Sequence, residues 1–166
     1  MKRNSIVSHY LLSIDQMDAY INDLTNEEIK KIFEPMNCIG WLLGHCSFYN
    51  YSIANKISGD QIPDHAKNYM NGSPHSTPEL DEIKNIWIDS VGKVKISLNN
   101  LSDDDLKNKL TSEFKHAETP EKINLGTDIS RLIFHLWNHL GEIASVRQLL
   151  GKNPGNPGYG RWDWRY

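Results

Sequence analysis

Two histidines, His135 and His139, stand four residues apart in the stretch Phe-His-Leu-Trp-Asn-His at 134–139. On a helix this spacing puts both imidazoles on one face, about 6 Å apart between Cβ atoms, from where they can bind one divalent ion. A third histidine, His45, ends the stretch Gly-Trp-Leu-Leu-Gly-His at 40–45. A chain with seven histidines places two of them four apart by chance on occasion, so the spacing permits a metal ion without requiring one.

The helical context of the pair strengthens the metal hypothesis. Apolar residues recur at steps of three and four between 132 and 150, and His139 interrupts this apolar seam. A neutral imidazole in a core needs a partner for each ring nitrogen, which a hydrogen bond or a metal ion can supply. The two interpretations are equally good for His139 alone. Burying His135 beside it doubles the desolvation cost, with no obvious gain unless the two share an ion.

Four amphipathic segments predict an all-α fold, a four-helix bundle with a short C-terminal aromatic tail. They span about 7–24, 35–57, 77–101 and 127–150, and no segment shows the sustained alternation of a strand. A capping box at 25–28 predicts an additional short helix. The expected starts and stops are Gly59 after the second segment, Thr77 and Pro78 before the third, Thr127 and Asp128 before the fourth, and Gly151 and Pro154 after it.

Length and composition indicate one domain over residues 1–166, because the chain is 39% hydrophobic and has no Pro/Gly/Ser-rich linker in its middle. The 18 basic and 21 acidic residues are interspersed, which leaves no basic stripe and argues against a nucleic-acid partner. Polar residues break every long apolar stretch, so we expect no membrane partner and no secretory leader.

The two cysteines are expected to be reduced core thiols in a cytoplasmic protein. Cys38 and Cys46 are eight residues apart on one predicted helix, about 12 Å along its axis, which is too far for a disulfide.

His45 lies next to Cys46, at the edge of the bundle core, where it can face the fourth helix. Three histidines from two helices would form a metal centre with an open position, as in catalytic zinc sites. Neither cysteine is well placed to fill that position, because Cys46 points about 100° away from His45 and Cys38 lies two turns off.

The histidine stretches at 40–45 and 135–151 resemble the two signature stretches of the DinB/YfiT-like metalloenzymes. The resemblance implies a four-helix bundle that holds zinc, nickel or a similar divalent ion on His45, His135 and His139, often as a homodimer. Characterised members of that family include transferases and isomerases that depend on a low-molecular-weight thiol. The resemblance therefore implies thiol transfer to a small-molecule substrate.

Three further residues are candidates for the site. Glu142 follows His139 by three residues on the same face, where it could orient the imidazole, act as a general base, or simply pair with a neighbour. Tyr49 and Asn138 share faces with the histidines and are candidate substrate-pocket residues. The sequence leaves two other functions open, hydrolysis by a metal-activated water and a stress-linked binding module with a structural metal.

Other motifs in the sequence are weaker indications of function. The Glu-x-x-His spacing at 113–116 is typical of di-iron bundles, but those need a second copy and two further glutamates. His65 and His75 lie in a polar segment and are expected to be solvated, and the acidic run at 102–105 fits an N-cap with first-turn acids. The aromatic residues of the tail at 155–166 are expected to pack on the bundle or on a second subunit.

Overall fold

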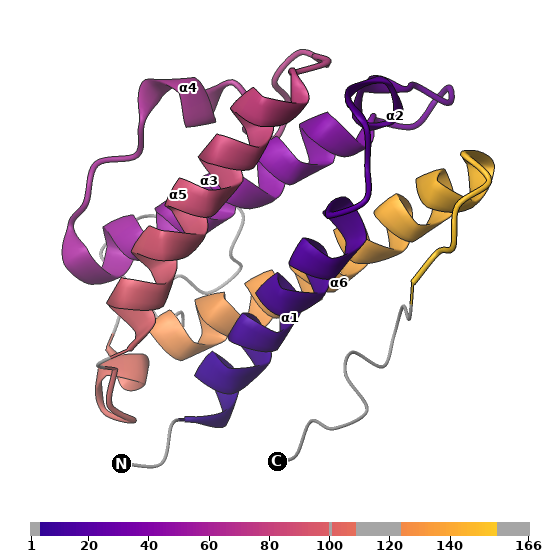
Figure 1. Ribbon diagram of the computed structural model, residues 1–166. Coiled ribbons are helices and arrows are strands. Elements are labelled where there is room, and N and C mark those ends of the chain that lie inside the picture. The colour runs from indigo at the N-terminus through magenta and orange to yellow at the C-terminus, as the bar shows by residue number, and fades with distance from the viewer. Residues whose placement is uncertain (1–3, 100, 109–123, 156–166) are drawn as a thin grey trace.

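Four long helices form the protein in the computed structural model, which describes residues 4–99, 101–108 and 124–155 (Figure 1). They are α1 (Ser5–Ile21), α3 (Ile39–Ser58), α5 (Leu80–Leu98) and α6 (Leu125–Leu149). The connections contain two short helices, α2 (Asn26–Lys30) and α4 (Asp64–Lys67), and the 3₁₀ turn η1 (Asp105–Lys107). The described residues form helices and no strand, so the predicted all-α class is confirmed.

The long helices are arranged as two packed pairs. The most extensive contacts join α3 to α5 and α1 to α6, and a contact between α3 and α6 connects the pairs. Figure 1 shows α1 and α6 running in one direction and α3 and α5 in the other. Because α3 and α5 are parallel, the chain must travel back along the bundle between them, and it does so over residues 59–79, which contain α4.

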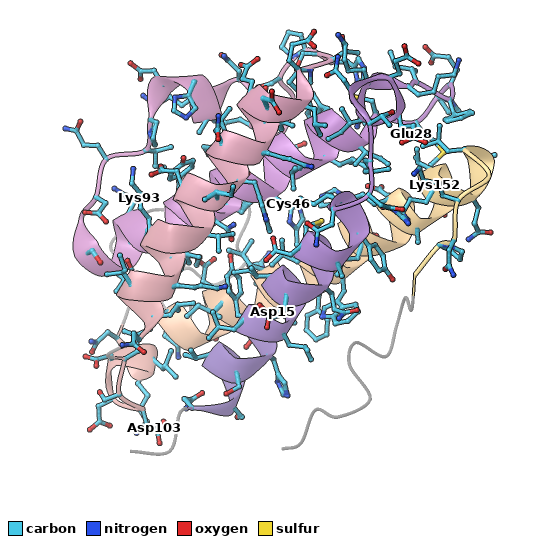
Figure 2. All side chains as sticks on the ribbon, in the orientation of Figure 1. Asp15, Glu28, Cys46, Lys93, Asp103 and Lys152 are labelled. Atoms are coloured by element: carbon cyan, nitrogen blue, oxygen red, sulfur yellow. The ribbon has the colours of Figure 1, made fainter. Side chains whose placement is uncertain are left out.

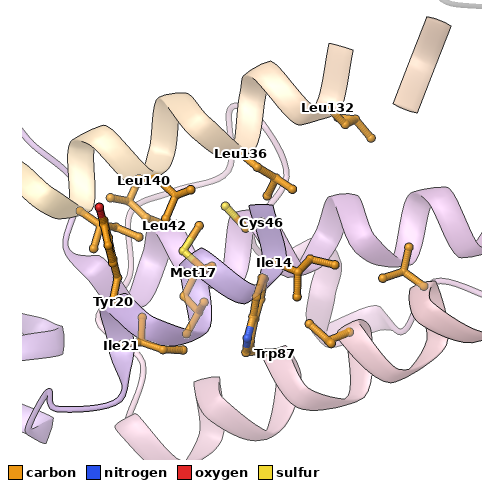
Figure 3. Packing of buried hydrophobic residues seen from close by; sticks show 14 of the residues in the cluster. Ile14, Met17, Tyr20, Ile21, Leu42, Cys46, Trp87, Leu132, Leu136 and Leu140 are labelled. Atoms are coloured by element: carbon orange, nitrogen blue, oxygen red, sulfur yellow. The ribbon is translucent and has the colours of Figure 1, made fainter. Parts of the chain in front are cut away.

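The core consists of the apolar seams that the sequence predicts. Side chains of α1, α3, α5 and α6 converge on one interior (Figure 3). The seam residues that are buried include Val7, Tyr10, Ile14, Met17, Leu43, Cys46, Ile83, Trp87, Leu136 and Ile143. Charged side chains such as Asp15 and Asp103 lie on the outside, while Cys46 lies between helices (Figure 2).

A chain of hydrogen bonds crosses the apolar interior. The hydroxyl of Tyr10 donates to Asn50 Oδ1 at 2.8 Å, and the Asn50 amide donates to Ser90 Oγ at 3.2 Å. All three side chains are fully buried and come from α1, α3 and α5. Each of these three buried side chains therefore has a partner on a neighbouring helix, which fixes the register between the helices.

Helix boundaries differ from the prediction where side chains cap the ends. Helix α3 begins at Ile39 instead of near 35, because the Cys38 sulfur accepts the backbone N–H of Trp41 and makes Cys38 the N-cap. Helix α5 begins at Leu80, whose N–H donates to the Asn26 side chain. Helix α6 starts earlier than predicted, at Leu125, since Asn124 caps it by accepting from Thr127.

The structure also bears on the expectations for the two cysteines, for the histidines outside the site and for membrane-spanning helices. Cys38 and Cys46 are buried and unbridged. His65 and His75 are exposed, as expected. None of the described helices combines the length and apolar character needed to cross a membrane. The Glu-x-x-His motif at 113–116 and the tail aromatics at 159–166 lie outside the described residues.

Candidate metal centre

Helices α3 and α6 bring the three predicted histidines together. His45 lies on α3, and His135 and His139 lie one turn apart on α6. One ring nitrogen from each histidine lies within 4.8 Å of the other two. His45 and His139 are buried and His135 is half-buried, so the group sits at the edge of the core. This arrangement could hold a metal ion.

Glu142 fixes the orientation of one of the three rings. Its carboxylate Oε2 lies 2.6 Å from His139 Nδ1. A carboxylate only accepts hydrogen bonds, so the proton of a neutral His139 ring resides on Nδ1. The lone pair of His139 then resides on Nε2, the atom that faces His135.

A backbone carbonyl fixes the second ring in the same way. His45 Nδ1 lies 2.6 Å from the carbonyl oxygen of Tyr69, which only accepts. The His45 lone pair is therefore on Nε2 as well. The Trp41 indole stacks on the same imidazole, with centroids 4.9 Å apart and an interplanar angle of 16°, and restricts its rotation.

His135 completes the group without such a partner. Its Nε2 lies 3.0 Å from His139 Nε2, and its Nδ1 is buried with no hydrogen-bond partner. Two nitrogens that bind one zinc ion at about 2.0 Å with tetrahedral angles lie about 3.3 Å apart. The His135–His139 separation is close to this value, so the donor set and the spacing of this pair fit a divalent ion.

Burial keeps two of the imidazoles in the form that binds metals. Desolvation lowers the pKa of His135 to about 4, assisted by its histidine neighbours. Desolvation also lowers the pKa of His45, against the opposing effect of the Tyr69 carbonyl. Both rings are neutral at pH 7, so metal binding need not release a proton from either ring to solvent. The hydrogen bond from His139 lowers the pKa of Glu142, which is ionised at that pH.

No fourth protein ligand belongs to the group within the described part of the chain. Burial raises the pKa of both Cys38 and Cys46, which disfavours the thiolate form that metals bind. Three histidines without a fourth protein ligand match the pattern of catalytic sites, in which an exchangeable ligand takes the remaining position.

The two predicted pocket residues have different environments. The Tyr49 ring makes edge contacts with His45 and His135, at centroid distances of 5.0 Å and 4.4 Å. Asn138 is exposed on α6. Tyr69 was not predicted from the sequence, because its contribution is a backbone carbonyl from an irregular segment and no side-chain pattern marks such an acceptor.

The bundle and its histidine group define the class of protein, an all-α fold in which two facing helices present three convergent imidazoles. The sequence profile of the DinB superfamily matches residues 9–143, a range that includes the three histidines and Glu142. The match covers most of the chain, so the protein belongs to the DinB superfamily. A search of curated proteins gave no match.

Proposed function

We propose that the protein is a divalent-metal-dependent enzyme, a transferase that joins a low-molecular-weight thiol to a small electrophilic substrate. One observation supports this proposal above the others. Hydrogen bonds at Nδ1 of His45 and His139 leave their Nε2 lone pairs converging beside His135, and no fourth protein ligand joins the group among the described residues.

A divalent ion bound there would supply a Lewis acid that lowers the pKa of a thiol or of water. Imidazole ligands suit both zinc and nickel. His45, His135 and His139 would hold the ion, and being neutral they would leave its full positive charge available.

In the proposed transfer the thiol replaces a leaving group on the substrate. The thiol sulfur forms a bond to an electrophilic carbon, and the leaving group departs with the electron pair of the bond that breaks. The thiol proton passes to solvent. Tyr49 lines the site beside His45 and His135, where its ring offers an apolar wall for a small substrate.

Glu142 is better suited to orient His139 than to accept a proton. Its Oε2 is engaged with His139 Nδ1 at 2.6 Å, and this bond lowers the pKa of its carboxyl. A lowered pKa makes a weaker base. A free carboxylate base beside the open position would favour hydrolysis, and Glu142 is instead engaged with His139, so this arrangement favours thiol transfer over base-assisted hydrolysis.

The proposal also includes a cellular compartment and an oligomeric state. Buried, unbridged Cys38 and Cys46 agree with a reducing compartment such as the cytoplasm, where low-molecular-weight thiols are abundant. A homodimer is the assembly that we propose from the family resemblance, and sedimentation of the full chain would test it.

The experiment begins with the full chain, purified without an affinity tag or added metal, and measures its metal content by elemental analysis. Consumption of a small thiol is then followed with a panel of electrophiles, with and without a chelator. We expect thiol consumption to require metal, protein and electrophile together. A metal-dependent reaction that proceeds equally well without thiol would contradict the transferase assignment and indicate activated water. A wild-type chain that binds neither zinc nor nickel would contradict the metal site itself.

A further inference from the structure

The segment that returns the chain from α3 to α5 is bonded to the face of α3 that carries His45. Two α3 side chains and the side chain of its N-cap residue donate to three backbone carbonyls of this segment, over residues 69–76. Trp41 Nε1 donates to Pro74 at 3.3 Å, and His45 Nδ1 donates to Tyr69 at 2.6 Å. The Cys38 thiol donates to Ser76 at 3.4 Å. Because 38, 41 and 45 follow the helical period, the bonds form one row along α3.

Gly44 is what allows the segment to approach so closely. A Cβ atom at this position would lie 2.4 Å from Cδ1, 2.6 Å from Cγ and 2.7 Å from Cε1 of Tyr69. Cβ contacts shorter than 3.0 Å are essentially never seen, so any side chain at 44 must displace the ring. Tyr69 is only 5% exposed, so its ring is closely packed, and we expect a displacement of the ring to move the backbone that bears it.

Tyr69 therefore links a packing contact to the metal site. The ring of Tyr69 rests on Gly44, and the carbonyl of Tyr69 accepts from the histidine that follows Gly44 in the sequence. We expect a displacement of the ring to shift the carbonyl and to lengthen or break the bond to His45 Nδ1. Without this acceptor, His45 can place its proton on Nε2, the nitrogen that must stay unprotonated to bind a metal.

We propose that Gly44 and Tyr69 act as a positioning pair for His45: the close contact between them holds the Tyr69 carbonyl against Nδ1 and thereby directs the Nε2 lone pair at the metal. The inference rests on the metal site proposed above and adds residues that touch neither the ion nor a substrate. It predicts that the smallest side chain at 44 weakens the site while leaving all three histidines in place.

Gly44→Ala is the direct test. In the metal-free protein at pH 8, long-range ¹H–¹⁵N NMR of the imidazoles should show His45 with its proton on Nδ1 in the wild type and a larger Nε2–H fraction in Gly44→Ala. Zinc affinity, measured by competition with a chelator, should fall about tenfold to a hundredfold, the range seen when a partner of a metal ligand is removed. An unchanged tautomer together with unchanged affinity would overturn the proposal.

Two other helical glycines provide matched controls. A Cβ atom at Gly92 or Gly141 meets nothing within 4 Å, and Gly141 lies on α6 only two residues from His139. Gly92→Ala and Gly141→Ala carry the same chemical change in a helix, and both should keep wild-type zinc affinity and the wild-type His45 tautomer. A loss in Gly141→Ala equal to that in Gly44→Ala would show that any helix alanine perturbs the site, and would contradict the role of the Tyr69 contact.

A double variant separates the proposed contact from a general loss of stability. Tyr69→Ala removes the ring but keeps the backbone carbonyl, so it makes room for a methyl group at 44. The double variant Gly44→Ala/Tyr69→Ala should bind zinc no more weakly than Tyr69→Ala alone, because the two changes act through one contact. Additive losses would overturn the proposal. If Gly44→Ala fails to fold, restoration of folding and zinc binding in the double variant supports the pair, and failure to restore them contradicts it.

The test distinguishes this inference from the proposed function. A wild-type chain that binds no metal would refute the metal site, yet the NMR measurement on metal-free protein would still show whether Gly44 and Tyr69 control the His45 tautomer. A wild-type chain that binds zinc, with Gly44→Ala indistinguishable from it in both measurements, would refute the positioning pair alone.

Discussion

The Nε2 atoms of His135 and His139 face each other at 3.0 Å across one turn of α6. Glu142 holds the His139 proton on Nδ1, so the His139 Nε2 atom has only a lone pair. In the metal-free protein a hydrogen bond across this contact requires His135 to donate its own Nε2 proton. Its Nδ1 is then a buried acceptor that has no partner. A metal ion in place of that proton would bind both Nε2 lone pairs and move the His135 proton to Nδ1.

The first prediction concerns the ligands. Alanine variants of His45, His135 and His139 should each lose the single equivalent of metal that the wild-type chain binds, measured by elemental analysis after exposure to zinc and gel filtration. Each variant should remain folded by circular dichroism, because a bundle of this size has enough apolar core without the ion. His75→Ala is the control, since His75 is exposed and should not affect metal content. A folded His139→Ala protein with wild-type stoichiometry would disprove the assignment.

Glu142→Gln should weaken metal binding without abolishing it. The amide keeps an acceptor oxygen for His139 Nδ1 but lacks the charge, so it orients the ring less strongly. We expect the zinc dissociation constant to rise about tenfold, and turnover at saturating metal to fall as well. Glu27→Gln, an exposed change on α2, should have no effect. Equal affinities in Glu142→Gln and wild type would mean that the contact between Glu142 and His139 has no role in the site.

The stability of the metal-free protein should depend on pH through His135 and His45. Burial lowers the pKa of His135 from 6.5 to about 4 and lowers that of His45 too. Between these values the unfolded chain binds more protons than the folded one. The stabilisation is therefore fully present above the unfolded value of 6.5 and is lost as the pH falls toward the lowered folded value.

Urea unfolding at pH 7.5, 6 and 5, with a chelator present, would measure this effect. His135→Gln should show a shallower fall in unfolding free energy over this range than the wild type, because it lacks the titrating group. His75→Gln should follow the wild-type profile, since His75 is exposed. Parallel profiles for wild type and His135→Gln would show that His135 is not the group responsible.

Much of the site could be predicted from sequence, because helical periodicity relates spacing to position. The step from His135 to His139 and then to Glu142 fixes three side chains on one face of α6 before any tertiary contact is known. His45 could be placed because its neighbour Cys46 belongs to a seam that must be buried. These inferences use only local geometry and the requirement that apolar faces meet.

The parts that sequence could not supply depend on irregular backbone. Tyr69 reaches His45 through a carbonyl, and every residue has one, so no residue type marks the acceptor. The sequence pattern also predicts too early a start for α3, because Cys38 is an unusual N-cap and the sulfur bond to the Trp41 N–H has no strong sequence signature. Gly44 is present in the sequence, but its structural role depends on which ring packs against it.

The last prediction concerns the buried hydrogen bonds that register α1 against α3. Tyr10→Phe removes the hydroxyl that donates to Asn50 Oδ1 at 2.8 Å, and both side chains are fully buried. The Asn50 oxygen would lose its donor in a place that water cannot easily reach, and leaving such an acceptor unpaired costs about 1–3 kcal/mol of unfolding free energy. Urea unfolding of metal-free protein at pH 7.5 would measure the loss.

Ser145→Ala is the control, because that hydroxyl bonds within α6 at an exposed position and its removal should change stability by no more than about 0.5 kcal/mol. Equal stabilities for Tyr10→Phe and Ser145→Ala would mean that Asn50 finds another donor and that the Tyr10 bond does not set the register of the two helices.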